Sequence, residues 1–140
     1  MPQANLTRRP GQSIDTSADT IVIALHLEGI PGGRTLDVEG FTDKGVVPDV
    51  IKGGHIIIEE DATGVHKPLS TNGDGTAYAA LPADHSYKGV LYGTIFTADP
   101  RAAIMVRGRV NTGAATVTQG LPPYPAAAVT ALKHINFAKR

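Results

Sequence analysis

Two arginines stand two positions apart near the end of the chain, in the run AIMVRGRVNTG at residues 103–113. A guanidinium group binds a phosphate or a carboxylate through two parallel hydrogen bonds, so Arg107 and Arg109 could together hold an anion. Because no aromatic residues are interleaved with them and the chain has no net charge, we do not expect a nucleic-acid groove here. A carboxylate on the same sheet or on a neighbouring subunit is the expected partner, which makes this pair a candidate interface.

The five histidines are the next candidates, because imidazole binds metals and transfers protons near neutral pH. No two of them have the i, i+4 spacing of helical metal ligands, and none lies in an HExxH motif. One histidine, His26, lies within an apolar run and is interpreted as a core or interface residue. We predict no metal site from any of the five, which are His26, His55, His66, His85 and His134.

Three consecutive acidic residues, Glu59, Glu60 and Asp61, could support acid–base chemistry or bind calcium. Adjacent strand residues point to opposite faces, however, and the spaced ligands of a calcium loop are absent, so we interpret the cluster as the solvated end of a strand. The glycine-rich residues 71–76 lack the Lys-Ser/Thr of a phosphate-binding loop, and no serine lies in a GxSxG context. The sequence predicts no catalytic site, no cofactor and no enzyme activity.

The composition restricts the class of protein. The chain has 140 residues, about the size of one domain, with 13 basic and 13 acidic residues and no cysteine. Balanced charge leaves no broad field for nucleic acid or an anionic membrane, and the lack of cysteine excludes disulfides and thiolate chemistry. The sequence has no signal-peptide core at its N-terminus and no apolar run near the roughly 20 residues that cross a bilayer. We expect a soluble protein that is made in a cytoplasm.

Sixteen glycines and ten prolines predict a turn-rich fold of many short strands. Residues 20–29 are expected to form a strand buried for much of its length, and residues 34–41 a strand with one wet face; the two could pair as a hairpin. Residues 46–54 contain Pro48 and are predicted as an edge strand or a loop. Further strands are expected at residues 55–60, 65–69 and 87–96, with a turn at 61–64 and a surface loop at 70–86.

Alternation in the arginine-bearing strand predicts which side chains point inward. The inward face is expected to hold Ile104, Val106, Gly108 and Val110, and the outward face Met105, Arg107 and Arg109. In the strand before it, Gly89 and Gly93 are expected at bulges or at a close approach of two backbones.

Residues 126–135 are rich in alanine, follow Pro125 and are predicted as the one helix, with a closing strand at residues 135–137. At the other end of the chain, residues 1–18 are polar and show no strand or helix periodicity. We expect them to be an extended arm that becomes ordered on a partner, and residues 19–140 to be a single, mainly β domain.

Several runs occur in a familiar order. KGGHIIIEEDATGVHKPL (residues 52–69) is a glycine-led strand, a turn and a return; YKGVLYGTIF (87–96) holds a Gly-Val-Leu strand; AIMVRGRVN (103–111) ends in Gly-x-Val-Asn; and a short helix precedes INF (135–137). This order, over about two thirds of the chain, resembles the lambda-like head decoration, or capsid cement, proteins of tailed bacteriophages. The section at residues 20–41 departs from the family, because it is longer than expected before the decoration domain.

The resemblance implies a small β-barrel or β-tulip-like domain that stabilises the outer surface of a phage head. It implies an oligomer, a trimer ahead of a dimer, and the major capsid protein as partner, without nucleic acid or membrane. The arm, residues 2–18, would dock on the capsid through Asn5, Leu6, Thr7, Arg8 and Arg9, and Arg107 and Arg109 would lie at a subunit or capsid interface. An arm of this kind can add its backbone to an exposed strand of the shell.

Other functions stay open on the sequence alone. One is the capsid-anchored base of a head fibre, in which the domain carries a longer appendage. Another is a carbohydrate-binding β module, against which the scarcity of aromatic residues argues, because sugar rings usually stack on aromatic side chains. An enzyme ranks last.

Overall fold

The computed structural model describes residues 16–39, 50–72 and 75–139. Within them the chain is mainly β, which confirms the predicted class. The strands are β1 (Ile23–Gly29), β2 (Arg34–Thr35), β3 (Val50–Ile51), β4 (Ile56–Glu60), β5 (His66–Pro68), β6 (His85–Leu91), β7 (Ile95–Phe96), β8 (Arg101–Ala102), β9 (Ile104–Asn111) and β10 (Ile135–Ala138), and the helices are α1 (Asp19–Val22), α2 (Thr112–Val117) and α3 (Ala126–Ala131).

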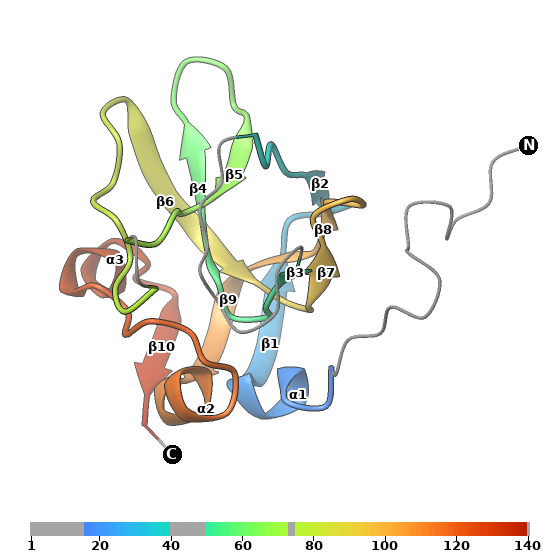
Figure 1. Cartoon of the computed structure of the whole chain (residues 1–140), viewed down its shortest axis with the longest axis vertical. Coiled ribbons are helices and arrows are strands. Elements are labelled where there is room, and N and C mark those ends of the chain that lie inside the picture. The colour runs from blue at the N-terminus through green and yellow to red at the C-terminus, as the bar shows by residue number, and fades with distance from the viewer. Residues whose placement is uncertain (1–15, 40–49, 73–74, 140) are drawn as a thin grey trace, which may run out of the picture.

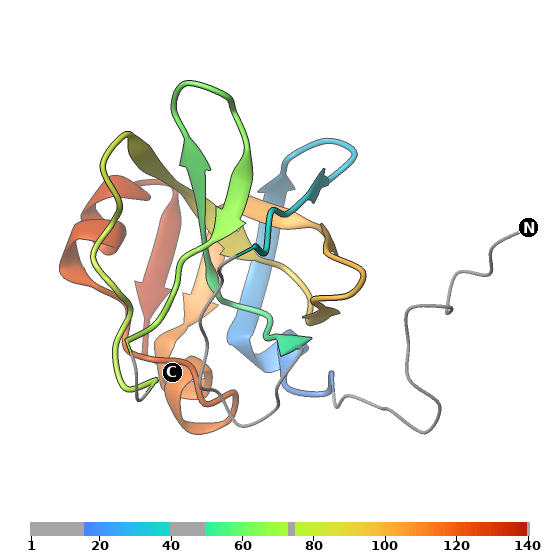
Figure 2. The same ribbon diagram turned by 45° about the horizontal axis from the view of Figure 1, so that its top comes forward.

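One six-stranded sheet organises the molecule, in the order β1-β9-β6-β4-β5 with β10 also paired to β9 (Figure 1). Strand β9 is its central strand, because it pairs with β1, β6 and β10. On one side β9 pairs with β1; on the other it pairs with β6 only at Ile104 and Met105, and with β10 in parallel from Gly108 to Asn111. Because β6 leaves β9 after two residue pairs, the sheet divides into a β4–β5–β6 part and a β1–β9–β10 part (Figure 2).

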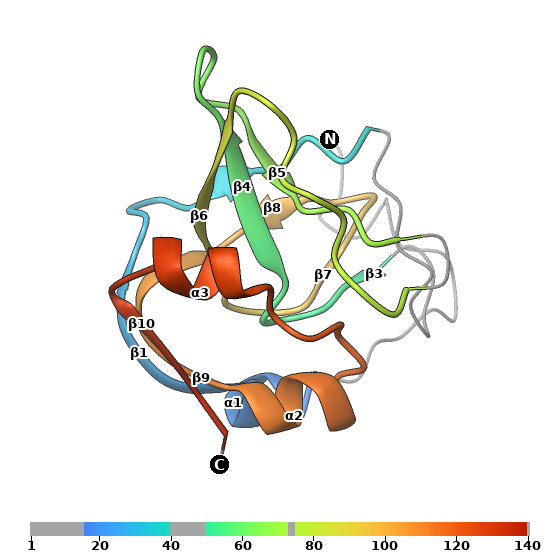
Figure 3. The same ribbon diagram turned by 90° about the vertical axis from the view of Figure 1, so that its left-hand side faces the viewer.

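The described strands form an open sheet and do not close into the barrel that the resemblance implies, since β1 and β5 are the two ends of the strand order. Short strand pairs, β2 with β8 and β3 with β7, form two small additional sheets. Figure 3 shows α1 and α2 together at one end of the molecule, with α3 separate from them. The expectation of one helix was therefore too low, because the described residues contain three.

The apolar core has three parts. In the first part, the start of β1 and the strands β6, β9 and β10 pack against α2 and the segments beside the helices. It includes Val22, Met105 and Val110. The second lies around Ile57, Leu91 and Ile104, and the third around Ile56, Ile58, Leu69, Tyr78 and Ala128. Neighbouring residues of β4 and β9 thus belong to different parts of the core, as expected for strands that are covered on both faces.

The first strand differs from its prediction in three ways. Residues Asp19–Val22 form the helical turn α1, so β1 begins only at Ile23. Residues 24–28 are exposed rather than buried. The hairpin prediction was wrong, because β1 pairs with β9 and β2 pairs with β8. The apolar residues of this run correctly indicate a strand, because they have high β propensity. They do not indicate its place at the edge of the sheet, which depends on pairing with the distant strand β9.

The middle of the chain follows the prediction more closely. Strand β4, the turn after it and strand β5 lie where expected, and residues 50 and 51 form a short strand. The predicted strand at 87–96 is two strands, β6 and β7. Close backbone approach is confirmed at Gly89, where a side-chain Cβ would collide with the Met105 carbonyl oxygen. The loop at 70–86 is not all surface, because Thr71 and Tyr78 pair and are buried.

Helix α2 was not predicted. It follows β9 directly, and the side chain of Asn111 caps it by accepting a hydrogen bond from the N–H of Ala114 at 3.3 Å. An asparagine just before TGAA is an N-cap signal that the strand pattern concealed. Helix α3 follows Pro125 as predicted but ends at Ala131, and β10 then forms the expected closing strand.

Candidate assembly edge and neighbouring polar groove

Strand β1 is an exposed edge that carries large apolar side chains. Within the described residues it pairs with β9 alone, so its other edge has no strand partner there. Leu25 is 45% exposed and Leu27 58%, and Ile21 of the adjoining helix α1 is 52% exposed. An open strand edge can accept another strand, and a group of exposed apolar side chains is typical of an interaction surface. We call β1 with Ile21 the β1 edge.

The arginine pair lies on β9, next to this edge. In the strand register Arg107 is opposite Glu28 and Arg109 is opposite Leu25. Arg107 is exposed, whereas Arg109 is half-buried and its buried Nε has no hydrogen-bond partner within the described ranges. The structure therefore puts both predicted interface residues beside the β1 edge, in different environments.

The predicted outward position of Met105 is wrong, since this side chain is fully buried in the first part of the core. The register between β1 and β9 shifts three times, and one shift lies between the pairs Glu28–Arg107 and Gly29–Met105. Met105 nevertheless lies on the opposite face from Ile104, as alternation predicts, since the two side chains belong to different parts of the core. It is buried because β9 is covered on both faces at this end, which alternation alone does not indicate.

The five residues predicted to bind the capsid, Asn5 to Arg9, lie outside the described residues. The described chain begins at Thr16, whose carbonyl oxygen accepts the Asp19 N–H at 3.1 Å. The next residues already belong to the body, because Ala18 is only 7% exposed. The boundary predicted after residue 18 thus falls inside a packed turn.

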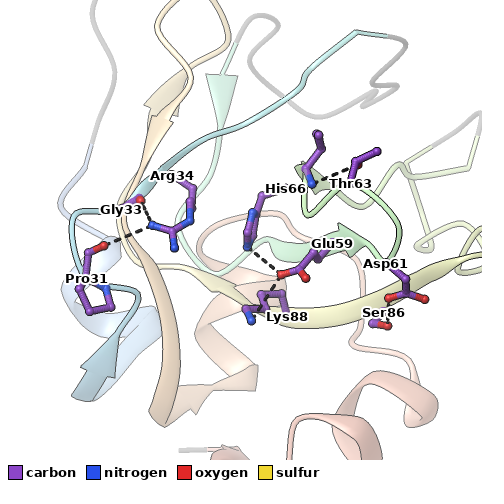
Figure 4. Close-up of polar contacts among 10 residues, drawn as sticks. Pro31, Gly33, Arg34, Glu59, Asp61, Thr63, His66, Ser86 and Lys88 are labelled. Atoms are coloured by element: carbon purple, nitrogen blue, oxygen red, sulfur yellow. Dashed lines mark hydrogen bonds and ion pairs between the residues drawn. The ribbon is translucent and has the colours of Figure 1, made fainter.

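A polar groove of about 550 Å³ lies on the line where the two parts of the sheet separate. At its centre the Glu59 carboxylate receives two basic side chains: His66 Nε2 lies 3.1 Å from Glu59 Oε2, and Lys88 Nζ lies 3.4 Å from the same oxygen. Figure 4 shows His66 and Lys88 converging on Glu59, with Arg34 beside them. These residues come from β2, β4, β5 and β6.

Burial differs strongly among these groups. The side chain of His66 is 7% exposed, that of Glu59 27% and that of Lys88 40%. Burial lowers the pKa of His66 below its ordinary value of 6.5; Glu59 acts in the opposite direction, and Lys88 and Arg34 lower this pKa further. A neutral His66 beside the Glu59–Lys88 ion pair is the state that follows from this balance near neutral pH.

The sequence analysis missed this grouping. It interpreted Glu59 as strand-end solvation and His66 as one of several scattered histidines, yet the two residues are cross-strand partners of the β4–β5 hairpin. The signal that could have found them is the turn DATG, because its position in the hairpin determines the register. Lys88 comes from the other neighbour of β4, where no local pattern could have indicated it.

His134 also lines the polar groove, whereas His26, His55 and His85 lie outside it. His26 is exposed on β1, and its ring packs edge-on against Tyr92 at a centroid distance of 4.5 Å. His55 is fully buried, with Nε2 2.7 Å from the Leu69 carbonyl oxygen, and His85 Nδ1 lies 2.8 Å from the Ala83 carbonyl oxygen. Residues 16–39, 50–72 and 75–139 contain no group of three histidine or acidic side chains placed to hold a metal.

None of the helices in the described ranges is long and apolar enough to span a membrane. No protein-family model, curated protein or solved structure matches this chain.

Proposed function

We propose that this protein is a non-enzymatic virion component that decorates and stabilises the head of a tailed bacteriophage by binding the major capsid protein on its outer surface. The observation that carries the proposal is the β1 edge: a strand with exposed Leu25 and Leu27 whose second edge has no partner strand in the described residues, directly after the point where the N-terminal segment joins the body. An isolated soluble domain gains nothing from such an edge, whereas an assembly subunit uses it for contact.

The β1 edge has the chemistry of a subunit interface. Its leucines supply apolar area, and the backbone N–H and C=O groups on the side of β1 away from β9, which no described strand pairs, can pair with a neighbouring chain. Glu28 on the β1 edge and Arg107, opposite it on β9, offer complementary charges to a second copy. A cyclic oligomer, with a trimer favoured over a dimer, would touch several capsid subunits at once and hold them through linked weak contacts.

Residues 1–15 are proposed to be the capsid-binding arm, with Asn5 to Arg9 as its contact residues. Asp19 ties the start of the body to a distant loop by hydrogen bonds to Thr94 and Gln119. Force on the arm would therefore pass into the folded domain at α1. The role needs no cofactor, nucleic acid or membrane.

Native mass spectrometry tests the oligomer. Wild type is expected to be a trimer or dimer, and Leu27→Lys is expected to be a monomer, because a charge in the centre of an apolar interface would be desolvated without a partner. The matched control is Val65→Lys, since Val65 is 36% exposed in the turn between β4 and β5, and β5 lies at the opposite end of the strand order from β1. A monomeric wild type, or equal loss of assembly in both variants, contradicts the proposed interface.

Capsid binding is tested separately with expanded phage heads and a chain that lacks residues 2–15. This deletion keeps Thr16 to Ala18, so the packed turn before α1 stays intact. The shortened chain is expected to keep its oligomeric state and to lose binding to heads in a sedimentation assay. Undiminished coating of heads by the shortened chain would refute the arm as the docking element.

A further inference from the structure

The polar groove is more positive than the chain as a whole. It is lined by three cationic side chains, Arg34, Lys88 and Lys133, against two carboxylates, Glu28 and Glu59, which leaves one positive charge before either lining histidine, His66 or His134, is protonated. The complete chain is neutral. Like signs gathered in a concave site attract a counter-ion more strongly than the same charges on a flat surface.

Arg34 is held in position for a ligand. Its Nη1 donates to the carbonyl oxygens of Gly33 at 2.7 Å and Pro31 at 3.3 Å, so the turn between β1 and β2 fixes the guanidinium (Figure 4). Both bonds use one nitrogen, and no carboxylate of the described chain pairs with this arginine. The other N–H groups of a guanidinium are arranged to bind the two oxygens of a phosphate or carboxylate.

Glu59 occupies the place that an anion would take. Its Oε2 lies between His66 Nε2 and Lys88 Nζ, at 3.1 and 3.4 Å. The Lys88 contact is long and Lys88 is 40% exposed, so this ammonium can turn toward a second anion at little cost. His66 is nearly buried, and its Nε2 lacks a well-aligned hydrogen-bond partner in the described chain.

The walls of the groove are partly apolar. Ile30 and Pro31 line one side, Val106 and Leu132 contribute from β9 and from the turn before β10, and Tyr87 lines it from β6. A pocket of a few hundred Å³ with apolar walls and a few convergent polar groups is the usual form of a small-ligand site.

We propose that this groove binds a small ligand that carries a phosphate or carboxylate group. The anionic group lies between Arg34 and Lys88, with Lys133 at the rim, and the remainder of the ligand contacts the apolar walls. Glu59 holds Lys88 and His66 in place when the groove has no ligand and repels the ligand's charge when it is bound. The groove shares Glu28 and Gly29 with the end of β1, but the proposed anion contacts at Arg34 and Lys88 lie outside the β1 edge, so the proposal does not depend on the capsid role.

Titrations with inorganic phosphate and with succinate test the proposal. Binding is measured by calorimetry and by the imidazole proton signals of the histidines in NMR spectra. Sodium chloride at matched ionic strength is the control for general screening. We expect saturable binding of at least one probe, with shifts of the His66 and His134 signals. Preference for phosphate identifies a phosphorylated ligand, and preference for succinate identifies a carboxylate ligand.

Two variants with opposite expected effects separate a binding site from a merely structural cluster. Arg34→Gln is expected to weaken binding by about tenfold or more, because a charge-assisted bidentate contact is lost. Glu59→Gln is expected to strengthen it several-fold, because a repelling carboxylate is removed and Lys88 is released. The matched control is Arg101→Gln, which changes an exposed arginine on the neighbouring strand β8, outside this groove, by the same charge.

Arg34 is exposed, so its variant is expected to fold, which a thermal melt verifies. The proposal is overturned if neither probe binds saturably to wild type, or if Arg34→Gln and Arg101→Gln weaken binding equally. It is also overturned if Glu59→Gln folds and binds more weakly than wild type. These measurements use the purified chain without capsids, so failure of the proposed capsid binding does not decide their outcome.

Discussion

Asp19 and Thr94, 75 positions apart in the chain, are joined by two hydrogen bonds: the Thr94 N–H donates to Asp19 Oδ2 at 2.8 Å, and the Thr94 hydroxyl donates to Oδ1 at 2.7 Å. Gln119 Nε2 donates to the same Oδ1 at 2.8 Å and to the Gly53 carbonyl oxygen at 3.2 Å. One carboxylate therefore connects the start of α1 to the segment after β6, to the end of α2 and, through Gln119, to the turn after β3.

Asp19→Ala is expected to destabilise the protein by about 2 to 3 kcal/mol, because it leaves the Thr94 N–H and the Gln119 amide without their charged acceptor. Urea unfolding followed by circular dichroism measures the change in the free energy of unfolding. The control is Asp37→Ala, since Asp37 is exposed and, among the described residues, its carboxylate accepts only the local N–H of Glu39. Its expected effect is below about 1 kcal/mol, and equal effects at the two sites would contradict an anchoring role for Asp19.

Tyr124→Phe is expected to lower the free energy of unfolding by about 1 to 2 kcal/mol. The Tyr124 hydroxyl donates to the Gly54 carbonyl oxygen at 2.7 Å, and burial raises the pKa of this phenol well above its ordinary value of 10. The matched control is Tyr92→Phe, because Tyr92 is 43% exposed and its change is expected to stay within about 0.5 kcal/mol. A Tyr124 variant as stable as wild type would show that solvent replaces the lost bond.

Gly108→Ala is expected to cost about 3 kcal/mol or more. Gly108 has φ +153°, and a Cβ there would collide with the Leu25 carbonyl oxygen and come within 2.7 Å of Met105 Sδ. Gly32→Ala separates the steric collision of the new Cβ from the strain of a positive φ. Gly32 has φ +76° but open space around the Cβ position, so only backbone strain of about 1 to 2 kcal/mol is expected. Similar thermal melts for the two variants would contradict a steric limit between β1 and β9.

Acidification is expected to destabilise the protein through His66. Burial lowers the pKa of His66 in the folded state below 6.5, so the unfolded chain takes up this proton first. Stability is therefore lost as the pH falls through 6.5 toward the lower folded-state pKa, and no further loss from this group occurs below it. Between about pH 7.5 and pH 5, wild type should lose more unfolding free energy than His66→Gln. Parallel stability curves for the two proteins would contradict this assignment.

Local pattern predicted those parts of the fold whose neighbours are close in sequence. The run of isoleucines at 56–58, the turn DATG and the return at 66–68 form one hairpin, and Pro125 begins α3. Prediction failed where contacts with residues distant in the sequence determine the burial of a side chain or the type of secondary structure. Met105 is buried because the first part of the core covers the face of β9 that was expected to be exposed, and α1 replaces the start of a strand where Asp19 binds Thr94 and Gln119.

The amino-acid sequence by itself determined that this chain is mainly β, without disulfides and without net charge, because β propensity, turn residues and composition are local quantities. Only the tertiary structure decided that β1 lies at an edge with its leucines exposed, and that Glu59, His66, Lys88 and Arg34 from four strands meet in one groove. The physical reason is that strand order and register depend on pairings between distant segments, whose free energy no short run of residues contains.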